Sequence, residues 1–106
     1  MSNSQHPVAI VDASIRDLVP GFLRNKRADI LGAVAALELG DFDRPRQVGH
    51  QLKGEGGAYC FSMISEIGGK LEDAALAGNQ SAALECARQL IDYLDTVQVR
   101  FSDDLG

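Results

Sequence analysis

The sequence has few residues that interrupt helices. Only three prolines occur among its 106 residues, at Pro7, Pro20 and Pro45, while alanine and leucine are plentiful. Because proline removes a backbone donor and breaks helices, its scarcity favours a helical protein. No segment alternates apolar and polar residues like a half-buried strand, and there is no internal repeat or low-complexity tract. A chain of this length predicts one all-α domain with a core of its own.

The sequence also lacks a cysteine framework and a membrane segment. Cys60 and Cys86 lie in separate apolar contexts and form no CxxC pair, so we interpret both as buried, reduced thiols. No apolar run approaches the roughly 18 residues of a membrane span, and the N-terminus has no signal-peptide pattern. We therefore expect a cytoplasmic protein. His6 lies in a polar segment far from His50, and no Cys/His spacing fits zinc, so we expect no metal and no cofactor.

An excess of positive charge is absent as well. The formal net charge is −5 and the sequence pI is near 4.8, which argues against nucleic acid or an anionic membrane as a partner. The basic residues are nevertheless concentrated in the first half of the chain, and they leave room for a locally positive face. They include Arg24, Lys26, Arg27, Arg44, Arg46 and Lys53.

What is present is helical periodicity. We expect residues 1–11 to form a flexible arm and residues 12–106 to form an up-down antiparallel four-helix bundle, because the predicted loops are short. Pro20 is expected either to separate a short N-terminal helix from the main first helix or to kink that helix. Leu18, Val19 and Phe22 are interpreted as core, although a docking patch is the alternative. The other expected boundaries are Asp12 or Ser14, Gly40, Asp41 or Asp43, about Tyr59, Ser62, "AGN" at 77–79, and Gln80, with the last helix carrying Phe101.

The second predicted helix contains an unusual number of glycines beside its histidine. The stretch "VGHQLKGEGGAYC" includes Gly49, Gly54, Gly56 and Gly57. Each glycine costs a helix interior about 0.5–1 kcal/mol relative to alanine, so together they cost roughly 2–4 kcal/mol. A loss of that size in a small domain needs a structural or functional reason.

A helical wheel gives these glycines two roles. At about 100° per residue, Val48, Leu52 and Tyr59 lie opposite His50 and form the core stripe, so the imidazole faces solvent. Gly54 and Gly57 lie within about 40° of the histidine and leave its face free of side chains. Gly49 and Gly56 lie at about 260° and 240°, where close helix packing explains them. Lys53 lies one turn from the histidine, on its side of the helix.

An exposed imidazole with a nearby cation and open space fits phosphoryl transfer. A neutral imidazole is a good nucleophile near neutral pH, and phosphoryl transfer mainly requires alignment and charge stabilisation. The chain has no Walker-type loop, kinase signature or acidic Mg²⁺ cluster, so we expect no ATP-dependent kinase activity of its own. An ordinary surface histidine remains the alternative interpretation from the residues alone.

The motif His50-Gln51-Leu52-Lys53-Gly54, followed by Gly57, resembles the H-x-L-K-G signature of histidine-containing phosphotransfer (HPt) domains of bacterial phosphorelays. The segments "LVPGFLRNKRADI", "ALELGDF" and "SEIGGKLEDAALAG" extend the resemblance over roughly residues 12 to 100. The chain departs from the family pattern at Ala58 and Cys60. These departures bear on partner choice more than on phosphorylation.

The resemblance implies a role for each residue of the motif. His50 would accept a phosphoryl group on Nε2 from the aspartyl phosphate of a receiver domain and pass it to another receiver. Lys53 would steady the phosphoryl oxygens, while Gly54 and Gly57 would leave room for the receiver. The receiver would supply Mg²⁺, and a hybrid histidine kinase is a further expected partner. The family fold is a four-helix bundle, often with a short N-terminal helix.

Three further polar residues surround this motif. Glu72, in the next helix, either orients the imidazole or is a solvated carboxylate. Gln47 and Gln51 flank the histidine and are candidates for contacting the phosphoryl group or a partner.

Two other functions remain open. The first is an adaptor that docks on a receiver or histidine kinase without accepting phosphate. The second is an enzyme that uses His50 as a general base, which would need a closed pocket and an orienting carboxylate. We expect a free-standing monomer.

Overall fold

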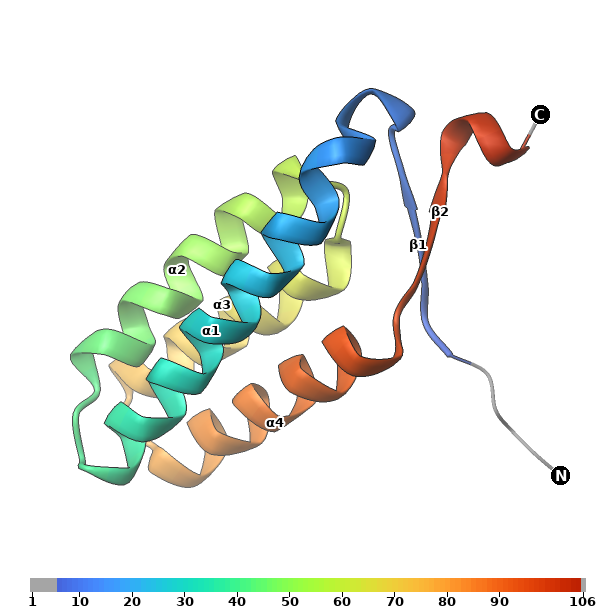
Figure 1. The fold of residues 1–106 in the computed structure, drawn as a ribbon. Coiled ribbons are helices and arrows are strands. Elements are labelled where there is room, and N and C mark those ends of the chain that lie inside the picture. Colours follow the sequence, from blue (N-terminus) through green and yellow to red (C-terminus); the bar gives the residue numbers. More distant parts are fainter. Residues whose placement is uncertain (1–5, 106) are drawn as a thin grey trace, which may run out of the picture.

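The computed structural model describes residues 6–105, in which four helices lie side by side with alternating direction (Figure 1). They are α1 (Val19–Glu38), α2 (Asp43–Ala58), α3 (Ser62–Leu76) and α4 (Gln80–Thr96). The predicted helical bundle is confirmed. Within residues 6–105, no helix combines the length and the apolar character that a membrane crossing requires.

The chain enters α1 through a short 3-10 helix, η1 (Ala13–Leu18). The Asp12 carboxylate caps η1 by accepting a hydrogen bond from the backbone N–H of Ser14 at 2.9 Å. Pro20 then lies in the first turn of α1, where a missing donor does little harm. The expected short helix before the main one is therefore present. The cap expected for α2 is different, because Phe42 precedes that helix and Asp43 is its first residue.

Three helices end in the same hydrogen-bonded turn, which needs one residue in the left-handed backbone region. Gly40 and Gly78 adopt it after α1 and α3, with φ of +79° and +64°. After α2 the same position holds Cys60, at φ +69°. There Cys60 N–H donates to the Gly57 carbonyl at 3.1 Å, and the next amide donates to the Gly56 carbonyl at 2.7 Å. A non-glycine residue in this conformation carries strain.

A small parallel sheet joins the two ends of the chain, contrary to the expectation of no strands. β1 (Val8–Val11) pairs with β2 (Gln98–Phe101) in the register Val8↔Gln98 to Val11↔Phe101. Residues 8–11 are therefore ordered, whereas residues 1–5 of the expected arm lie outside the described residues. The fourth helix ends at Thr96, because Val97 leaves helical geometry with ψ of 133°.

Burial and side-chain contacts hold the sheet on the bundle. Ala9 and Val11 face inward and belong to the hydrophobic core. The Arg16 guanidinium lies 4.2 Å from the centroid of the Phe101 ring and forms an ion pair with Asp103. Asp103 belongs to a second 3-10 helix, η2 (Ser102–Leu105). These contacts explain why a four-residue strand forms where its own sequence gives a weak signal.

The core lies between the helices and is built from the periodic apolar residues. The largest side chains with almost no exposed surface include Val11, Ile30, Leu37, Leu52, Phe61, Ile64, Leu71 and Leu90. Leu18 departs from the expectation, because its side chain is 54% exposed and lies outside the core. The exposed apolar surface of Leu18 lies where α1 begins.

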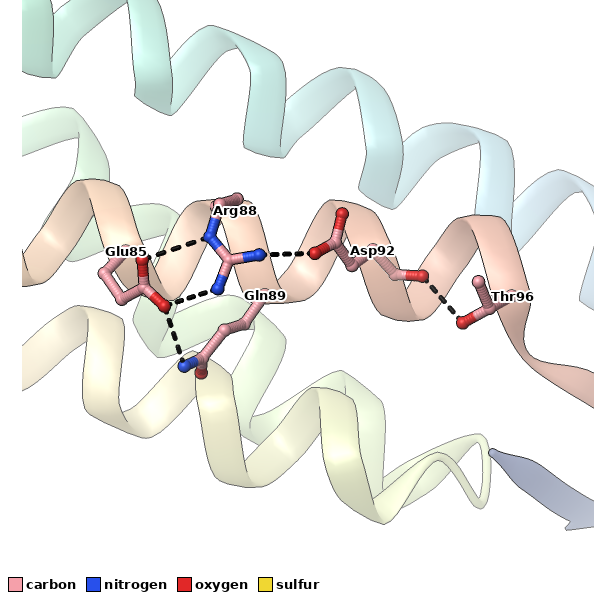
Figure 2. A network of polar contacts seen from close by, with 5 residues as sticks. All are labelled: Glu85, Arg88, Gln89, Asp92 and Thr96. Atoms are coloured by element: carbon pink, nitrogen blue, oxygen red, sulfur yellow. Dashed lines mark hydrogen bonds and ion pairs between the residues drawn. The ribbon is translucent and has the colours of Figure 1, made fainter. Parts of the chain in front are cut away.

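The outer face of α4 carries a chain of surface ion pairs (Figure 2). Arg88 Nη1 donates to Asp92 at 2.6 Å, and Arg88 Nε donates to Glu85 at 3.1 Å. This contact with Arg88 lowers the pKa of Glu85. Thr96 Oγ1 donates to the Asp92 carbonyl at 2.8 Å, in the last turn of the helix. Exposed pairs of this kind stabilise a helix only weakly, and they keep this face polar.

Candidate functional site

His50 projects from the middle of α2 into solvent, with 71% of its side chain exposed. Val48 and Leu52, on the opposite side of the helix, are buried, and Tyr59 packs against the core. The orientation predicted by the helical wheel is therefore correct. The imidazole is accessible to a macromolecule approaching from outside the bundle.

The glycines around His50 divide into two groups, as the wheel indicated. A Cβ atom added at Gly49 would lie 2.6 Å from the Glu72 backbone nitrogen, and one added at Gly56 would lie 2.5 Å from the Ser65 backbone nitrogen. These glycines allow α2 and α3 to approach closely. A Cβ added at Gly54 would meet nothing within 4 Å, and one at Gly57 would meet only the Ser65 hydroxyl at 3.9 Å. The glycines on the histidine's face thus have no packing role there.

Glu72 reaches His50 from α3. Its Oε2 atom lies 3.1 Å from Nδ1 of the imidazole, and only 16% of its side chain is exposed. The interpretation of Glu72 as a solvated carboxylate is therefore wrong. A carboxylate accepts hydrogen bonds only, so this contact favours a proton on Nδ1 and leaves the lone pair on Nε2. Gly49 makes the contact possible, because a side chain there would push the Glu72 backbone away.

Lys53 is exposed one turn after His50 and leans over α3. Its Cδ atom lies 3.6 Å from where a Cβ on Gly69 would be. The Ser65 hydroxyl donates to the Lys53 carbonyl at 2.6 Å and ties this turn of α2 to α3. Gln47 and Gln51 are also exposed on α2. The face therefore offers an imidazole, an ammonium group and polar amides without a covering element.

A groove of about 400 Å³ runs between the first half of α1 and the last half of α2. It is lined by Asp17, Leu18, Gly21, Phe22, Asn25, Lys26, Glu55 and Tyr59. At its base the rings of Phe22 and Tyr59 stack, with centroids 4.1 Å apart and planes 13° apart. The exposed Leu18 gives the groove an apolar wall.

A largely buried lysine in the lining of this groove pairs with acidic residues, a feature that the sequence analysis missed. Lys26 is 8% exposed; it forms an ion pair with Glu55 on α2 and lies 3.3 Å from Asp29 on its own helix. Burial lowers the pKa of Lys26, but hydrogen bonds to Glu55 and Asp29 outweigh burial, so the pKa lies above its ordinary value. The periodicity of α1 places position 26 on the buried face, which was the available signal.

The two cysteines differ from the expectation of two buried thiols. Both are free, as expected, but Cys60 is exposed because its left-handed backbone turns the side chain outward. Cys86 is half-buried, and burial raises the pKa of its thiol. Among residues 6–105, no three His, Cys, Asp or Glu side chains gather in a way that suits a metal ion.

Comparisons with known protein families agree with this geometry. The model of the family described as Hpt domain matches residues 17–100, more than half of the chain, and this range contains His50, Lys53 and Glu72. Comparisons with curated proteins and with solved structures give no match. Hpt domains are phosphocarriers rather than kinases, and they interact with receiver domains and histidine kinases. The chain belongs to the Hpt family, the histidine phosphotransfer modules of two-component systems.

Proposed function

We propose that His50 carries the phosphoryl group, accepting it on Nε2 from the aspartyl phosphate of one receiver domain and passing it to another. The observation that carries the proposal is the 3.1 Å contact between Glu72 and Nδ1 on a histidine that is 71% exposed. The contact favours the tautomer in which Nε2 carries the lone pair, and the exposure of the ring supports access by a receiver.

The transfer step follows from this arrangement. The Nε2 lone pair attacks phosphorus while the bond from phosphorus to the aspartyl oxygen breaks, and the released electron pair restores the receiver's carboxylate. The Nδ1 proton stays on the ring, which gains positive charge as the N–P bond forms. The Glu72 carboxylate stabilises that charge through the existing hydrogen bond. In the onward step, the carboxylate of a second receiver attacks phosphorus, and the N–P bond breaks as its electron pair returns to Nε2.

The surroundings of His50 support transfer between proteins. Lys53 is exposed one turn from His50, within reach of phosphoryl oxygens on Nε2, and the open positions at Gly54 and Gly57 leave room for the receiver's loops. Gln47 and Gln51 supply polar contacts at the edge of the same face. The Leu18 side of the α1–α2 groove provides apolar surface for the same partner.

The metal ion needed for transfer comes from the partner. The receiver brings Mg²⁺ and the carboxylates that bind it, and this chain holds no cofactor and hydrolyses no ATP. We place the carrier in the bacterial cytoplasm, where receivers and the kinase domains of hybrid kinases operate.

A transfer assay tests the proposal. A receiver domain carrying ³²P-labelled aspartyl phosphate is mixed with the wild-type chain and with His50→Gln, which keeps a polar side chain of similar size. We expect label on the wild-type chain and none on the variant. Label on His50→Gln would overturn the assignment of the phosphorylated residue.

A binding measurement on the same pair separates a carrier from an adaptor. Receiver affinity is measured by isothermal titration calorimetry for both chains, because His50→Gln removes the nucleophile and leaves the docking face. We expect both to bind, with transfer only to the wild type. Binding by both without transfer to either, across the hybrid kinases and receivers of the source organism, would favour the adaptor.

A further inference from the structure

The outward face of β1 is apolar and unusually open for so small a domain. Val8 and Ile10 are each more than half exposed, whereas Ala9 and Val11, which alternate with them, are buried against the bundle. β1 carries no charged side chain and begins outside residues 17–100, the part matched by the family model. The family resemblance therefore gives no role to this strand.

The edge of β1 opposite β2 presents backbone N–H and C=O groups that β2 does not pair. Gln98 N–H donates to the Pro7 carbonyl at 2.8 Å, so the backbone carbonyl of Pro7 points toward β2. Backbone groups of successive residues in a strand point to alternate edges, so this bond determines which residues of β1 face β2. In a parallel pair, the groups of Ala9 and Val11 then point toward β2, and those of Val8 and Ile10 point to the other edge. Within residues 6–105, no backbone hydrogen bond engages Val8 or Ile10 along that edge.

We propose, in place of the monomer expected from the sequence, that this edge of β1 pairs antiparallel with β1 of a second copy of the chain at high concentration, giving a dimer with a continuous four-stranded sheet. Centred on Ala9, the pairing places Val8 opposite Ile10 of the second copy, where the two residues exchange both backbone hydrogen bonds. It also places His6 opposite Asp12 of the second copy. His6 and Asp12 are both exposed, and their charges are complementary when the imidazole is protonated.

The two edge strands of this sheet differ in charge, and the difference favours pairing through β1 rather than β2. On the outward face, β2 presents Gln98 and Arg100, and charged side chains are a usual protection of an edge against pairing. The uncharged β1 has no such protection. In the dimer, Val8 and Ile10 of both copies form an apolar centre flanked by the polar residues of β2, which is the usual organisation of an interface.

The dimer is expected to be weak and to leave the phosphotransfer face open. A stable complex buries about 800 Å² of accessible surface on each partner, and a four-residue edge buries far less. Dimer formation is therefore expected only at high protein concentration. β1 lies beyond the end of the bundle where α1 begins, away from the middle of α2 that carries His50 (Figure 1). Each dimer would therefore present two His50 faces, which suits simultaneous engagement of a dimeric partner.

Sedimentation equilibrium over a concentration series tests the pairing. From about 10 μM to about 1 mM, the weight-average mass of the wild-type chain is expected to rise from 11.3 kDa toward twice that value. Ile10→Lys adds a charge at the centre of the pair and is expected to stay monomeric throughout. Leu39→Lys is the matched control, since Leu39 is 86% exposed at the end of α1, and it is expected to dimerise like the wild type.

Amide NMR spectra locate the contact. With rising concentration, the amide signals of Val8 and Ile10 are expected to shift and to exchange more slowly with solvent, while the Leu39 amide signal stays unchanged. A wild-type chain that stays monomeric up to about 1 mM would refute the proposal. So would a dimer that persists in folded Ile10→Lys, or one that leaves the Val8 and Ile10 signals unchanged. None of these results depends on phosphorylation of His50.

Discussion

The carboxylate of Glu72 on α3 lies 3.1 Å from Nδ1 of His50 on α2, a contact that favours a proton on Nδ1 and a lone pair on Nε2. Replacing Glu72 with alanine removes the acceptor, so the ring loses both its orientation and the charge that stabilises the transfer step. We expect Glu72→Ala to slow transfer from a phosphorylated receiver roughly tenfold, the effect of losing one charge-assisted hydrogen bond. The measurement is rapid-quench kinetics with saturating receiver.

The matched control is Glu72→Gln, whose amide oxygen still accepts a hydrogen bond from Nδ1–H but carries no charge. Glu72→Gln is expected to keep the proton on Nδ1, which the ¹⁵N chemical shifts of the imidazole report. Its transfer rate is expected to lie between those of the wild type and Glu72→Ala. Equal rates for Glu72→Ala and the wild type would show that the contact has no part in transfer.

Alanine substitutions in the two groups of glycines are expected to change the unfolding free energy in opposite directions. Gly54→Ala adds a methyl group in open space, so the helix is expected to gain about 0.5–1 kcal/mol in unfolding free energy. The same methyl stands beside His50, so transfer from a receiver should slow. Labelling by phosphoramidate, a small donor that needs no docking, should stay unchanged. Urea unfolding and the two labelling assays measure these effects.

Gly49→Ala is the contrasting variant on the same helix. Its methyl group would lie 2.6 Å from the Glu72 backbone nitrogen, so α2 and α3 must separate. Overpacking costs about 1–3 kcal/mol, which outweighs the gain of about 0.5–1 kcal/mol in helix propensity. We expect a net loss of stability in urea unfolding. A stabilised Gly49→Ala would contradict the close approach of α2 and α3.

Cys60 carries backbone strain that a substitution can relieve. Left-handed backbone at a non-glycine residue costs about 1–2 kcal/mol, and glycine at the same helix end removes most of that cost. Cys60→Gly is expected to raise the unfolding free energy by about 1 kcal/mol. Cys60→Ala keeps the strain and should show no comparable gain. Equal stability of the two variants in urea would argue against the left-handed conformation.

The stability of the fold should fall at alkaline pH. Burial raises the pKa of Tyr93 and of Cys86, and hydrogen bonds to acidic neighbours overcome burial to raise that of Lys26. A raised folded-state pKa stabilises the fold below the unfolded value and loses that contribution as pH rises through the folded one. The loss should therefore begin near the ordinary thiol value of 9.0 and continue above 10.5.

Variants separate these contributions. Unfolding free energies measured between pH 8 and pH 11 are expected to decline less steeply for Tyr93→Phe and for Cys86→Ser than for the wild type, because each lacks one titrating group. Parallel curves for the wild type and both variants would contradict this origin of the decline.

The sequence was sufficient for features that depend on one helix alone. The periodicity of Val48 and Leu52 defined the core side of α2, and the direction of His50 followed from it. The same wheel separated Gly49 from Gly54, because a single helical repeat decides which glycine meets a neighbour. The motif around His50 also indicated the family, because it lies within a single helix.

Features that depend on two distant segments were harder to predict. β1 is four residues long and pairs with a strand about 90 positions later, so its apolar run alone was ambiguous between an arm and a strand. Contact between Glu72 and His50 depends on how closely two helices approach. The burial of Lys26 depends on Glu55, a partner on another helix. Cys60 was misassigned because its apolar neighbours suggested burial, whereas its backbone turns it outward.

The central claim is that the phosphoryl group resides on Nε2 of His50. ³¹P and ¹⁵N NMR spectra of the chain after transfer from a phosphorylated receiver test it directly. The account predicts one acid-labile, base-stable phosphohistidine, with phosphorus coupled to Nε2 of His50 and absent from His50→Gln. Phosphorus on Nδ1, on another residue, or absent after incubation with every phosphorylated receiver of the source organism would contradict it.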